Sequence, residues 1–310
     1  MPNNRECPLD GILLIDKEEG KTSFEVVKGV KRILGIKKVG HAGTLDPFAT
    51  GLLIILIGRG TKLSSYLMAG KKRYLASIRL GIETDTLDPT GKIINEMPVP
   101  VLDEEAIEKT LNGFKGVVEQ VPPAFSAINI KGQRAYKLAR RGFDVKLEKR
   151  KVSIYYIGLI NVRLPVITVD VICSPGTYIR SLASDIGRRL GSVAHLKKLR
   201  RVSSGSFEVD DSFAWKDFKQ SSGDDLKKGI ISMNAALPDM LEIVVDDGMA
   251  ARIKNGHKPS WEDLFKDNES PGIFLENIKL ANNSSLVAIL EIDQPMDRGE
   301  KWIKKLRVFN

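Results

Sequence analysis

The chain has 310 residues, of which 42% are hydrophobic and 28% are charged, a composition typical of globular proteins and unlike disordered or fibrous ones. Its net charge is +9, and residues 1–202 carry 34 Lys and Arg against 20 Asp and Glu, which favours a nucleic-acid partner. No apolar run reaches the ~18 residues of a membrane span, and the N-terminus shows no secretory signal. Two distant cysteines and three scattered histidines indicate a reducing cytoplasm and no metal cluster.

The first part of the chain predicts a strand, a helix and a second strand. Residues 11–17 form a short apolar run, and residues 22–35 repeat apolar side chains with helical spacing. Thr22 and Glu25 have the spacing of a capping box at the start of this helix. The strongly apolar residues 52–57 predict a buried strand.

The loop before that strand, residues 40–51, reads GHAGTLDPFATG. Pro47 restricts Asp46 to extended backbone conformations. The glycines of the loop allow tight turns or the close approach of a ligand. A carboxylate fixed in this way can act as a nucleophile or a base. On residue type alone, an aspartate that caps its own turn is the more common outcome.

Residues 72–81 predict another strand, with Tyr74 on its apolar face, and residues 84–91 have the composition of a turn. Acidic residues open a predicted helix at 103–113. Residues 119–150 are basic and have few apolar anchors, which predicts an arm that projects from the core.

Strands are predicted again at 152–163 and 166–173, followed by a helix that ends at Gly191. The acidic segment 210–235 has a helical, linker-like pattern. Short strands follow from about Leu241, so a domain boundary is predicted near residue 243. Helices mixed irregularly with antiparallel strands indicate the α+β class.

Five motifs in order resemble the TruB family of tRNA pseudouridine synthases: DKEEGKTS, VGHAGTLDPFATGLL, KRYLASIRLG with TDTLDPTG, CSPGTYIRSLASDIG and AHLKKLRR. The resemblance implies a mixed, largely antiparallel central sheet flanked by helices, in a catalytic domain of residues 1–243. It identifies the arm at 119–150 with the family's thumb insertion. It identifies residues 244–310 with a small β-rich, RNA-binding PUA-like domain.

The family isomerises the T-loop uridine at position 55 of tRNA, after flipping that base out of the loop. The resemblance implies that Asp46 is the essential catalytic aspartate and that Arg180 is its ion-pair partner, which would lower the pKa of the carboxyl group. Tyr74 matches the aromatic residue that stacks on the target base. Tyr178 and Leu199 match further residues of the pocket. His41 matches the residue that fills the space left by the flipped base.

Basic residues of the arm and of a later segment, which the sequence places at a helix end, would hold RNA phosphates. They are Lys131, Arg134, Lys137, Arg140 and Arg141, and then Lys197, Lys198, Arg200 and Arg201. The resemblance implies an enzyme with tRNA as its partner and without cofactor, metal, membrane or obligatory protein partner, working as a cytoplasmic monomer.

The sequence departs from the family pattern at Glu18, Phe125 and Asn129, which stand where the family usually has Pro, Tyr and Lys. Two alternatives stay open. One is the related guide-RNA-dependent branch of archaea and eukaryotes, which is not expected to carry the arm or TDTLDPTG. The other is a non-catalytic tRNA-binding chaperone, which would need the basic residues but not Asp46, Tyr74 and Arg180 together.

Overall fold

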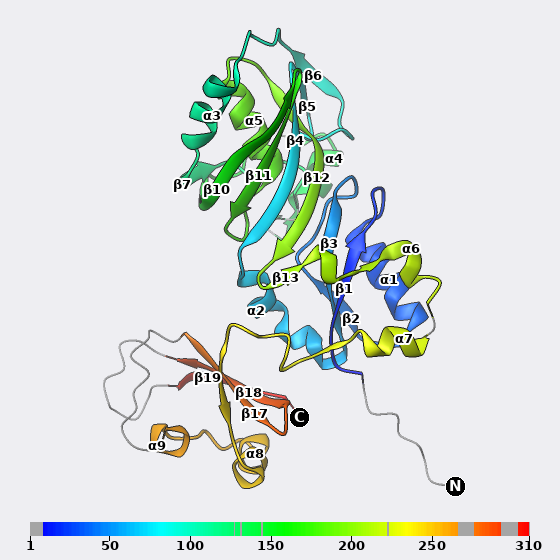
Figure 1. Cartoon of the computed structure of the whole chain (residues 1–310), viewed down its shortest axis with the longest axis vertical. Helices are drawn as coiled ribbons and strands as arrows, with labels where there is room; N and C mark the ends of the chain where they lie inside the picture. Colours follow the sequence, from blue (N-terminus) through cyan, green and yellow to red (C-terminus); the bar gives the residue numbers. More distant parts are fainter. Residues whose placement is uncertain are drawn as a thin grey trace.

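The computed structural model describes residues 9–126, 128–130, 132–143, 145–221, 223–265, 276–292 and 303–309. These residues form a large mixed sheet and a smaller four-stranded sheet, which lies below the large one along the long axis of the molecule (Figure 1). The α+β architecture predicted from the sequence is confirmed.

The large sheet has a path of eight strands in the order β14-β1-β3-β12-β4-β11-β10-β7, with β13, β15 and β2 attached at its sides. Its strands are β1 (Gly11–Lys17), β2 (Val39–Ala42), β3 (Thr50–Ile57), β4 (Lys72–Leu80), β7 (Gly116–Gln120), β10 (Arg150–Arg163), β11 (Val166–Cys173), β12 (Ala194–Ser204), β13 (Phe207–Glu208), β14 (Phe213–Ala214) and β15 (Ile231–Ser232). Most neighbours are antiparallel, but β12 runs parallel to β3. This parallel pair lies in the middle of the sheet and joins its two halves.

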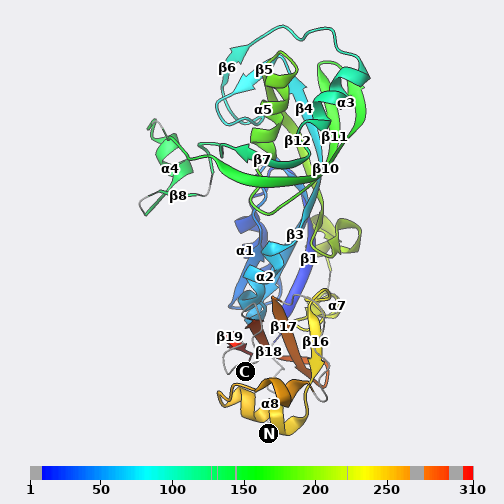
Figure 2. The ribbon, with the colours of Figure 1, turned by 90° about the vertical axis from the view of Figure 1, so that its left-hand side faces the viewer.

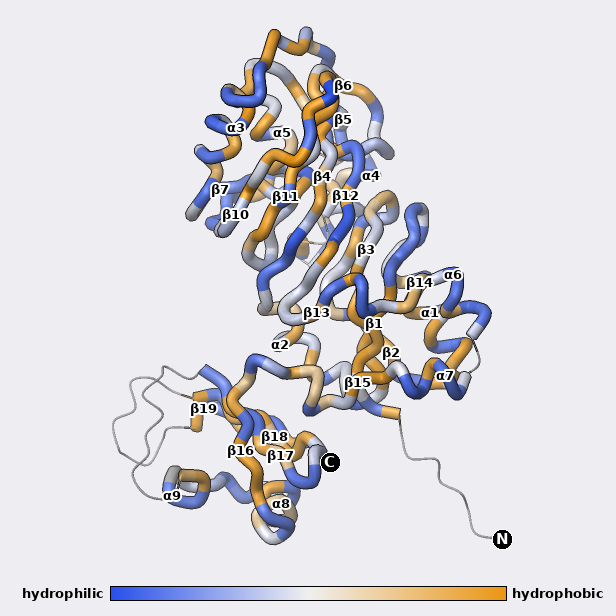
Figure 3. The backbone as a smooth tube through the Cα atoms, viewed as in Figure 1, coloured by the Kyte–Doolittle hydropathy of each residue, from blue (hydrophilic) through white to orange (hydrophobic). Residues whose placement is uncertain are grey.

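The apolar runs of the sequence form the centre of this sheet. Every residue of β3 from Gly51 to Ile57 is buried, and β1 pairs with it along its whole length. In β11 buried and partly exposed residues alternate, as expected for a strand with one covered face. Figure 3 shows the hydrophobic residues concentrated along the strands. The strands predicted at 11–17, 52–57, 72–81, 152–163 and 166–173 are therefore confirmed to within about two residues.

The helices of this part are α1 (Ser23–Ile33), α2 (Ser64–Ala69), α3 (Glu104–Asn112), α5 (Ile179–Arg189), α6 (Trp215–Phe218) and α7 (Gly223–Lys228), with 3-10 turns η1 (Gly58–Leu63) and η2 (Val209–Asp211). The capping box of Thr22 and Glu25 is present at the start of α1. The segment 210–235 was expected to be helical and linker-like, but it holds only short helices and strand pairs. Its Trp215 and Phe218 are buried against the core.

The arm leaves the sheet after β7 and returns at the start of β10. It contains β8 (Asn129–Ile130), β9 (Gln133–Arg134) and α4 (Ala135–Arg140), while a small hairpin of β5 (Ile82–Thr84) and β6 (Ile93–Glu96) follows β4. Figure 2 shows α4 standing away from the sheet on one side, with α3 on the opposite side. The projecting arm predicted from the basic composition is confirmed.

The smaller sheet has the order β16 (Leu241–Val244), β17 (Asn277–Asn282), β18 (Ser285–Ile292) and β19 (Ile303–Val308), and α8 (Asp247–Lys254) packs on it. Another short helix, α9 (Trp261–Leu264), follows α8. The boundary predicted near residue 243 falls inside β16, so the smaller sheet begins at Leu241. The sequence did not predict β17 or α8.

The two sheets share one hydrophobic cluster. Leu286, Ile289 and Phe309 of the C-terminal part are buried together with Leu63 and Leu67 of the larger part. The cluster fixes the smaller sheet against η1 and α2. Within the described ranges, no helix combines the length and the apolarity needed to cross a membrane.

Candidate active site

The backbone of the loop that carries Asp46 is held by hydrogen bonds from residues 17–23. The hydroxyl of Ser23 donates to the carbonyl oxygen of Leu45 at 3.1 Å and accepts from the Leu45 amide at 2.9 Å. The buried amine of Lys17 and the amide of Gly20 donate to the carbonyl oxygen of Pro47 at 3.2 and 2.8 Å. The backbone on each side of Asp46 is therefore held, while 32% of its side chain stays exposed.

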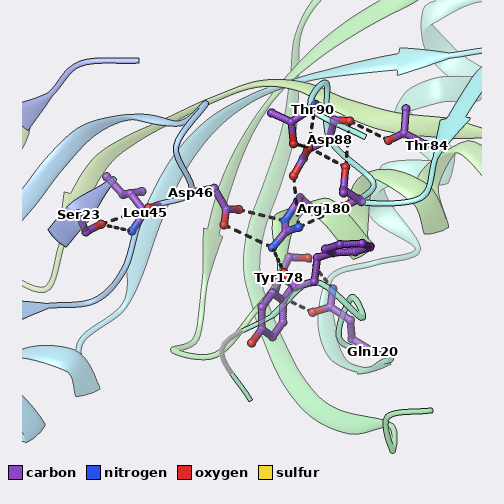
Figure 4. Close-up of polar contacts among 11 residues, drawn as sticks. Ser23, Leu45, Asp46, Thr84, Asp88, Thr90, Gln120, Tyr178 and Arg180 are labelled. Atoms are coloured by element: carbon purple, nitrogen blue, oxygen red, sulfur yellow. Dashed lines mark hydrogen bonds and ion pairs between the residues drawn. The ribbon is translucent and has the colours of Figure 1, made fainter. Parts of the chain in front are cut away.

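Arg180, at the start of α5, lies between two carboxylates (Figure 4). Its Nε lies 3.0 Å from Oδ2 of Asp46, and its Nη1 lies 3.3 Å from Oδ2 of Asp88. The carbonyl oxygens of Thr86 and Phe125 accept from the same guanidinium at 3.0 and 2.9 Å. The predicted contact between Asp46 and Arg180 is thus present. Asp88 is a second carboxylate that contacts the same guanidinium.

Asp88 is itself held in one orientation. Its Oδ1 accepts from the amide and hydroxyl of Thr90 at 2.9 and 2.6 Å and from the hydroxyl of Thr86 at 2.7 Å. Its side chain is 6% exposed. A buried carboxylate fixed by these donors can orient Arg180.

The pKa of the Asp46 carboxyl is raised from its ordinary value. Burial is the largest cause, and the negative charge of Asp88 adds to it, while Arg180 and Lys17 act in the opposite direction. The expected lowering by Arg180 exists, but burial exceeds it. The expectation of a lowered pKa is therefore wrong in its net direction.

Tyr178 precedes α5 and is fixed through its backbone. The side-chain amide of Gln120 donates to its carbonyl oxygen at 3.0 Å and accepts from its N–H at 2.7 Å. The guanidinium of Arg150 lies 4.6 Å from the centre of the Tyr178 ring. Because Arg180 is two residues further on, the same backbone bonds also place the arginine that meets Asp46.

Tyr74, Leu199 and Arg201 lie on one face of the paired strands β4 and β12. Leu199 stands opposite Ala76, and Arg201 stands opposite Tyr74. Tyr74 is partly exposed, whereas 7% of Leu199 is exposed. The strand pair therefore brings Tyr74 and Leu199, two of the residues expected in the pocket, onto one face of the sheet.

The basic run 197–201 was expected at a helix end, but it lies within β12. Because side chains alternate along a strand, Lys198 and Arg200 point to the sheet face opposite Leu199 and Arg201. Arg200 is paired with Asp16 there, with Nη2 2.7 Å from Oδ2. Arg201 is 1% exposed, so its assignment to the RNA backbone is wrong. Lys197 and Lys198 are exposed.

His41 lies on β2, opposite Ile55 of β3, and is half-buried. Burial and the nearby charge of Arg201 lower the pKa of its imidazole. The neutral ring is therefore favoured, which suits a side chain that stacks against a base rather than one that carries charge.

In the arm, Lys137 and Arg140 belong to α4, and Arg134 and Arg141 flank it. The guanidinium of Arg140 lies 5.7 Å from the centre of the Tyr136 ring. The predicted residue Lys131 lies outside the described residues. The arm reaches the site through the backbone of Phe125, so the departure from the family pattern at this position does not remove the contact with Arg180.

Sequence reasoning missed Asp88, Lys17 and Gln120. A signal for Asp88 was available, since the tetrapeptide TLDP occurs twice, at 44–47 and at 86–89. Each copy supplies one carboxylate to Arg180. Lys17 is fully buried, and its amine donates to the carbonyl oxygens of Glu18, Lys21 and Pro47. Burial is the main cause that lowers its pKa to about 8.

This arrangement presents a fixed, partly exposed carboxylate that is paired with Arg180 and lies close enough to Tyr74 to affect the pKa of its phenol. A carboxylate in such a setting can attack an electrophilic carbon or accept a proton. The aromatic ring of Tyr74 can stack on a flat heterocycle.

Two family models match consecutive parts of the chain. Residues 31–179 match the N-terminal domain of the TruB family of pseudouridylate synthases. Residues 180–238 match the tRNA pseudouridylate synthase B C-terminal domain.

Curated relatives are similar along nearly the whole chain. A tRNA pseudouridine synthase B of Clostridium kluyveri is 44% identical over 248 residues, covering 80% of this chain and 84% of the relative. That of Geotalea uraniireducens is 38% identical over 304 residues, covering 97% and 98%.

Solved structures share the fold. The chain superposes on a Cbf5–Nop10–Gar1 complex with a TM-score of 0.68 and 25% identity, covering 92% of this chain and 78% of that one. An H/ACA RNP bound to a substrate RNA containing 2′-deoxyuridine gives a TM-score of 0.70 and 23% identity, covering 97% and 83%.

Proposed function

Because the chain belongs to the TruB family and is a tRNA pseudouridine synthase, we propose that it isomerises uridine 55 of the tRNA T-loop with Asp46 as the catalytic residue. The observation that carries this assignment is the position of Asp46. Its carboxylate is partly open to solvent, fixed by its backbone and paired with Arg180.

The reaction replaces the bond between C1′ and N1 of uridine by a bond between C1′ and C5. The hydrogen on C5 leaves as a proton and N1 gains one, so the product is an isomer and no electrons are gained or lost. Asp46 serves as the nucleophile or the base that starts this exchange, and it does so in its ionised form. Its raised pKa makes it a stronger base than an exposed aspartate.

The side chains around Asp46 are proposed to hold a flipped-out base. Tyr74 stacks on the uracil, while Tyr178 and Leu199 form the walls of its pocket. His41 takes the place of the base inside the RNA loop. Extrusion of the base is needed because the reacting atoms of a stacked uridine are out of reach.

We propose that the exposed cations of the arm bind the phosphates of the tRNA backbone. They are Arg134, Lys137, Arg140 and Arg141. The PUA-like sheet from Leu241 onward extends the RNA-binding surface. The proposed enzyme works as a monomer in the cytoplasm, without guide RNA or obligatory protein partner.

The alternative of a guide-RNA-dependent enzyme is less well supported. The relatives named tRNA pseudouridine synthase B are 37–51% identical to this chain, whereas the Cbf5 structure shares 25%. A non-catalytic chaperone leaves the joint presence of Asp46, Tyr74 and Arg180 unexplained.

The direct test is to incubate the purified protein with a transcript of tRNA and with an isolated T-stem-loop. Pseudouridine is then mapped at each nucleotide. We expect one modified position, at uridine 55, in both RNAs. Modification elsewhere, or only in the presence of an added guide RNA, would refute the proposed specificity.

A further inference from the structure

Arg201 is the largest side chain that is almost completely removed from solvent, with 1% exposed. Arginine is almost never fully buried unless it is paired. Among the residues that the structure describes, no carboxylate forms an ion pair with Arg201, in contrast to the neighbouring Arg200, which pairs with Asp16. A buried guanidinium of this kind requires another explanation.

The hydrogen bonds of Arg201 go to the segment that carries Asp46. Its Nε donates to the carbonyl oxygen of Leu52 at 2.7 Å, and its Nη2 donates to that of Gly43 at 3.1 Å. Gly43 lies three residues before Asp46, and Leu52 lies six residues after it. One planar side chain therefore connects both ends of the catalytic loop.

Two glycines of this loop, Gly43 and Gly51, lie against Arg201. A Cβ at Gly51 would overlap the backbone carbonyl of Arg201, and a Cβ at Gly43 would lie 3.4 Å from its Nη1. Both glycines also have positive φ angles, +101° and +96°. At Gly51 the missing side chain makes room for the paired backbone of Arg201 rather than for a ligand, and at Gly43 the positive φ angle by itself favours glycine.

Arg201 also meets Tyr74, which stands directly opposite it across the paired strands β12 and β4. Side chains at such positions share one face of the sheet and lie within contact distance. Burial raises the pKa of the Tyr74 phenol, while the nearby charge of Arg201 acts in the opposite direction.

We propose that Arg201 is a positioning residue for the isomerisation, which holds the loop of Asp46 and the ring of Tyr74 in a fixed relation to each other. The inference rests on the proposed function of these two residues. Only a guanidinium offers fixed donors in several directions, whereas lysine carries one compact amine. Arg201 does not touch the RNA, and it acts through the two residues that do.

The test compares Arg201→Met and Arg201→Lys with Arg73→Met, a matched control next to Tyr74 on β4, where the Arg73 guanidinium is paired with Asp170 at 2.8 Å. Single-turnover rates of pseudouridine formation and tRNA dissociation constants are measured for all variants. We expect Arg201→Met to slow the reaction about a hundredfold through misplacement of the reacting groups, with tRNA affinity unchanged. Arg201→Lys should be intermediate, and Arg73→Met should react like the unmodified enzyme.

A second readout separates positioning from a loss of folded protein. Added guanidinium ions should restore part of the reaction rate of the Arg201→Ala variant, since they can occupy the space that the Arg201 side chain leaves. The same ions should slow the reaction of the control variant. The rate is expressed per folded molecule, from a thermal unfolding curve of each variant. An unchanged rate per folded molecule, absence of rescue, or a defect in tRNA affinity alone would overturn the proposal. The unmodified enzyme acting on tRNA tests the proposed function independently.

Discussion

Asp46 and Asp88 lie on two sides of one guanidinium, 3.0 and 3.3 Å from nitrogen atoms of Arg180. Asp88 is almost completely buried and bound by Thr86 and Thr90, whereas Asp46 is partly open to solvent. The buried carboxylate fixes the arginine, and the arginine then presents the exposed carboxylate. Substitutions of Asp46 and of Asp88 separate these two roles.

Asp46→Asn should abolish pseudouridine formation, because the amide can neither attack carbon nor accept a proton as the carboxylate does. Its tRNA affinity should stay close to that of the unmodified enzyme, since neither the arm nor the smaller sheet is altered. Pseudouridine yield and a filter-binding assay measure the two quantities. Turnover by the Asn variant near the original rate would show that another residue starts the reaction.

Asp88→Asn should change the pH dependence of the reaction. The charge of Asp88 raises the pKa of Asp46, so removing it lowers that pKa. In the proposed reaction ionised Asp46 is the active form, so the rate should rise with pH through this pKa. This rise should move to lower pH in the variant. The plateau rate should also fall, since Arg180 loses an orienting partner. A single-turnover rate profile tests this, and a rise displaced to higher pH would contradict it.

The double variant Lys137→Gln with Arg140→Gln should weaken tRNA binding and make it less dependent on salt. Each lost phosphate contact reduces the slope of log K against log salt by about 1. The control is Lys109→Gln with Lys115→Gln, two exposed cations in and just after α3, on the other side of the sheet from α4 (Figure 2). Equal effects of the two double variants would refute a specific role for the arm.

The sequence predicted the elements whose signals are local. The strand at 11–17 and the capped helix α1 follow from apolar runs and the capping box. The strand at 194–204 was missed because two pairs of adjacent basic residues, at 197–198 and 200–201, are not typical of a buried strand. Its burial comes from pairing with β3 and β4, which are distant in the chain. Tertiary pairing of this kind overrides the local composition.

The same limit applies to the site. The position of Asp46 beside Arg180 followed from resemblance, and the structure shows their contact. The composition of residues 84–91 predicts only a turn around Asp88, because the burial of Asp88 against α5 cannot be seen from neighbouring residues. The direction of the pKa shift of Asp46 was missed for a related reason. The sequence names the cation beside the carboxyl group but does not reveal how far both are removed from water.

The buried amines of Lys17 and Lys72 should make stability rise with pH in the alkaline range. Burial lowers the pKa of each amine from 10.5 to about 8. Between these values the unfolded chain binds more protons than the folded one, so the free energy of unfolding increases with pH. Urea unfolding at several pH values should show a smaller increase in Lys17→Met than in the exposed-site control Lys109→Met. Identical pH dependence in both variants would contradict the assignment.

Phe309→Ala should loosen the smaller sheet from the catalytic part of the molecule. The ring is 2% exposed in the shared cluster, and the Lys62 amine lies 5.6 Å from its centre. Removing a buried phenylalanine lowers the free energy of unfolding by about 3–5 kcal/mol. The matched control is Phe24→Ala, because the ring of Phe24 is 62% exposed and its loss should change stability by less than about 0.5 kcal/mol.

The second consequence of Phe309→Ala concerns binding rather than stability. If the catalytic part and the smaller sheet bind one tRNA together, their motion relative to each other is lost on binding. This loss costs free energy in the Phe309→Ala variant, so tRNA affinity should fall. Affinity for an isolated T-stem-loop, held by the arm and the active site, should change less. Comparing the two dissociation constants tests this difference. An equal loss for both RNAs would place the effect of Phe309 on the catalytic part instead of on the second RNA contact.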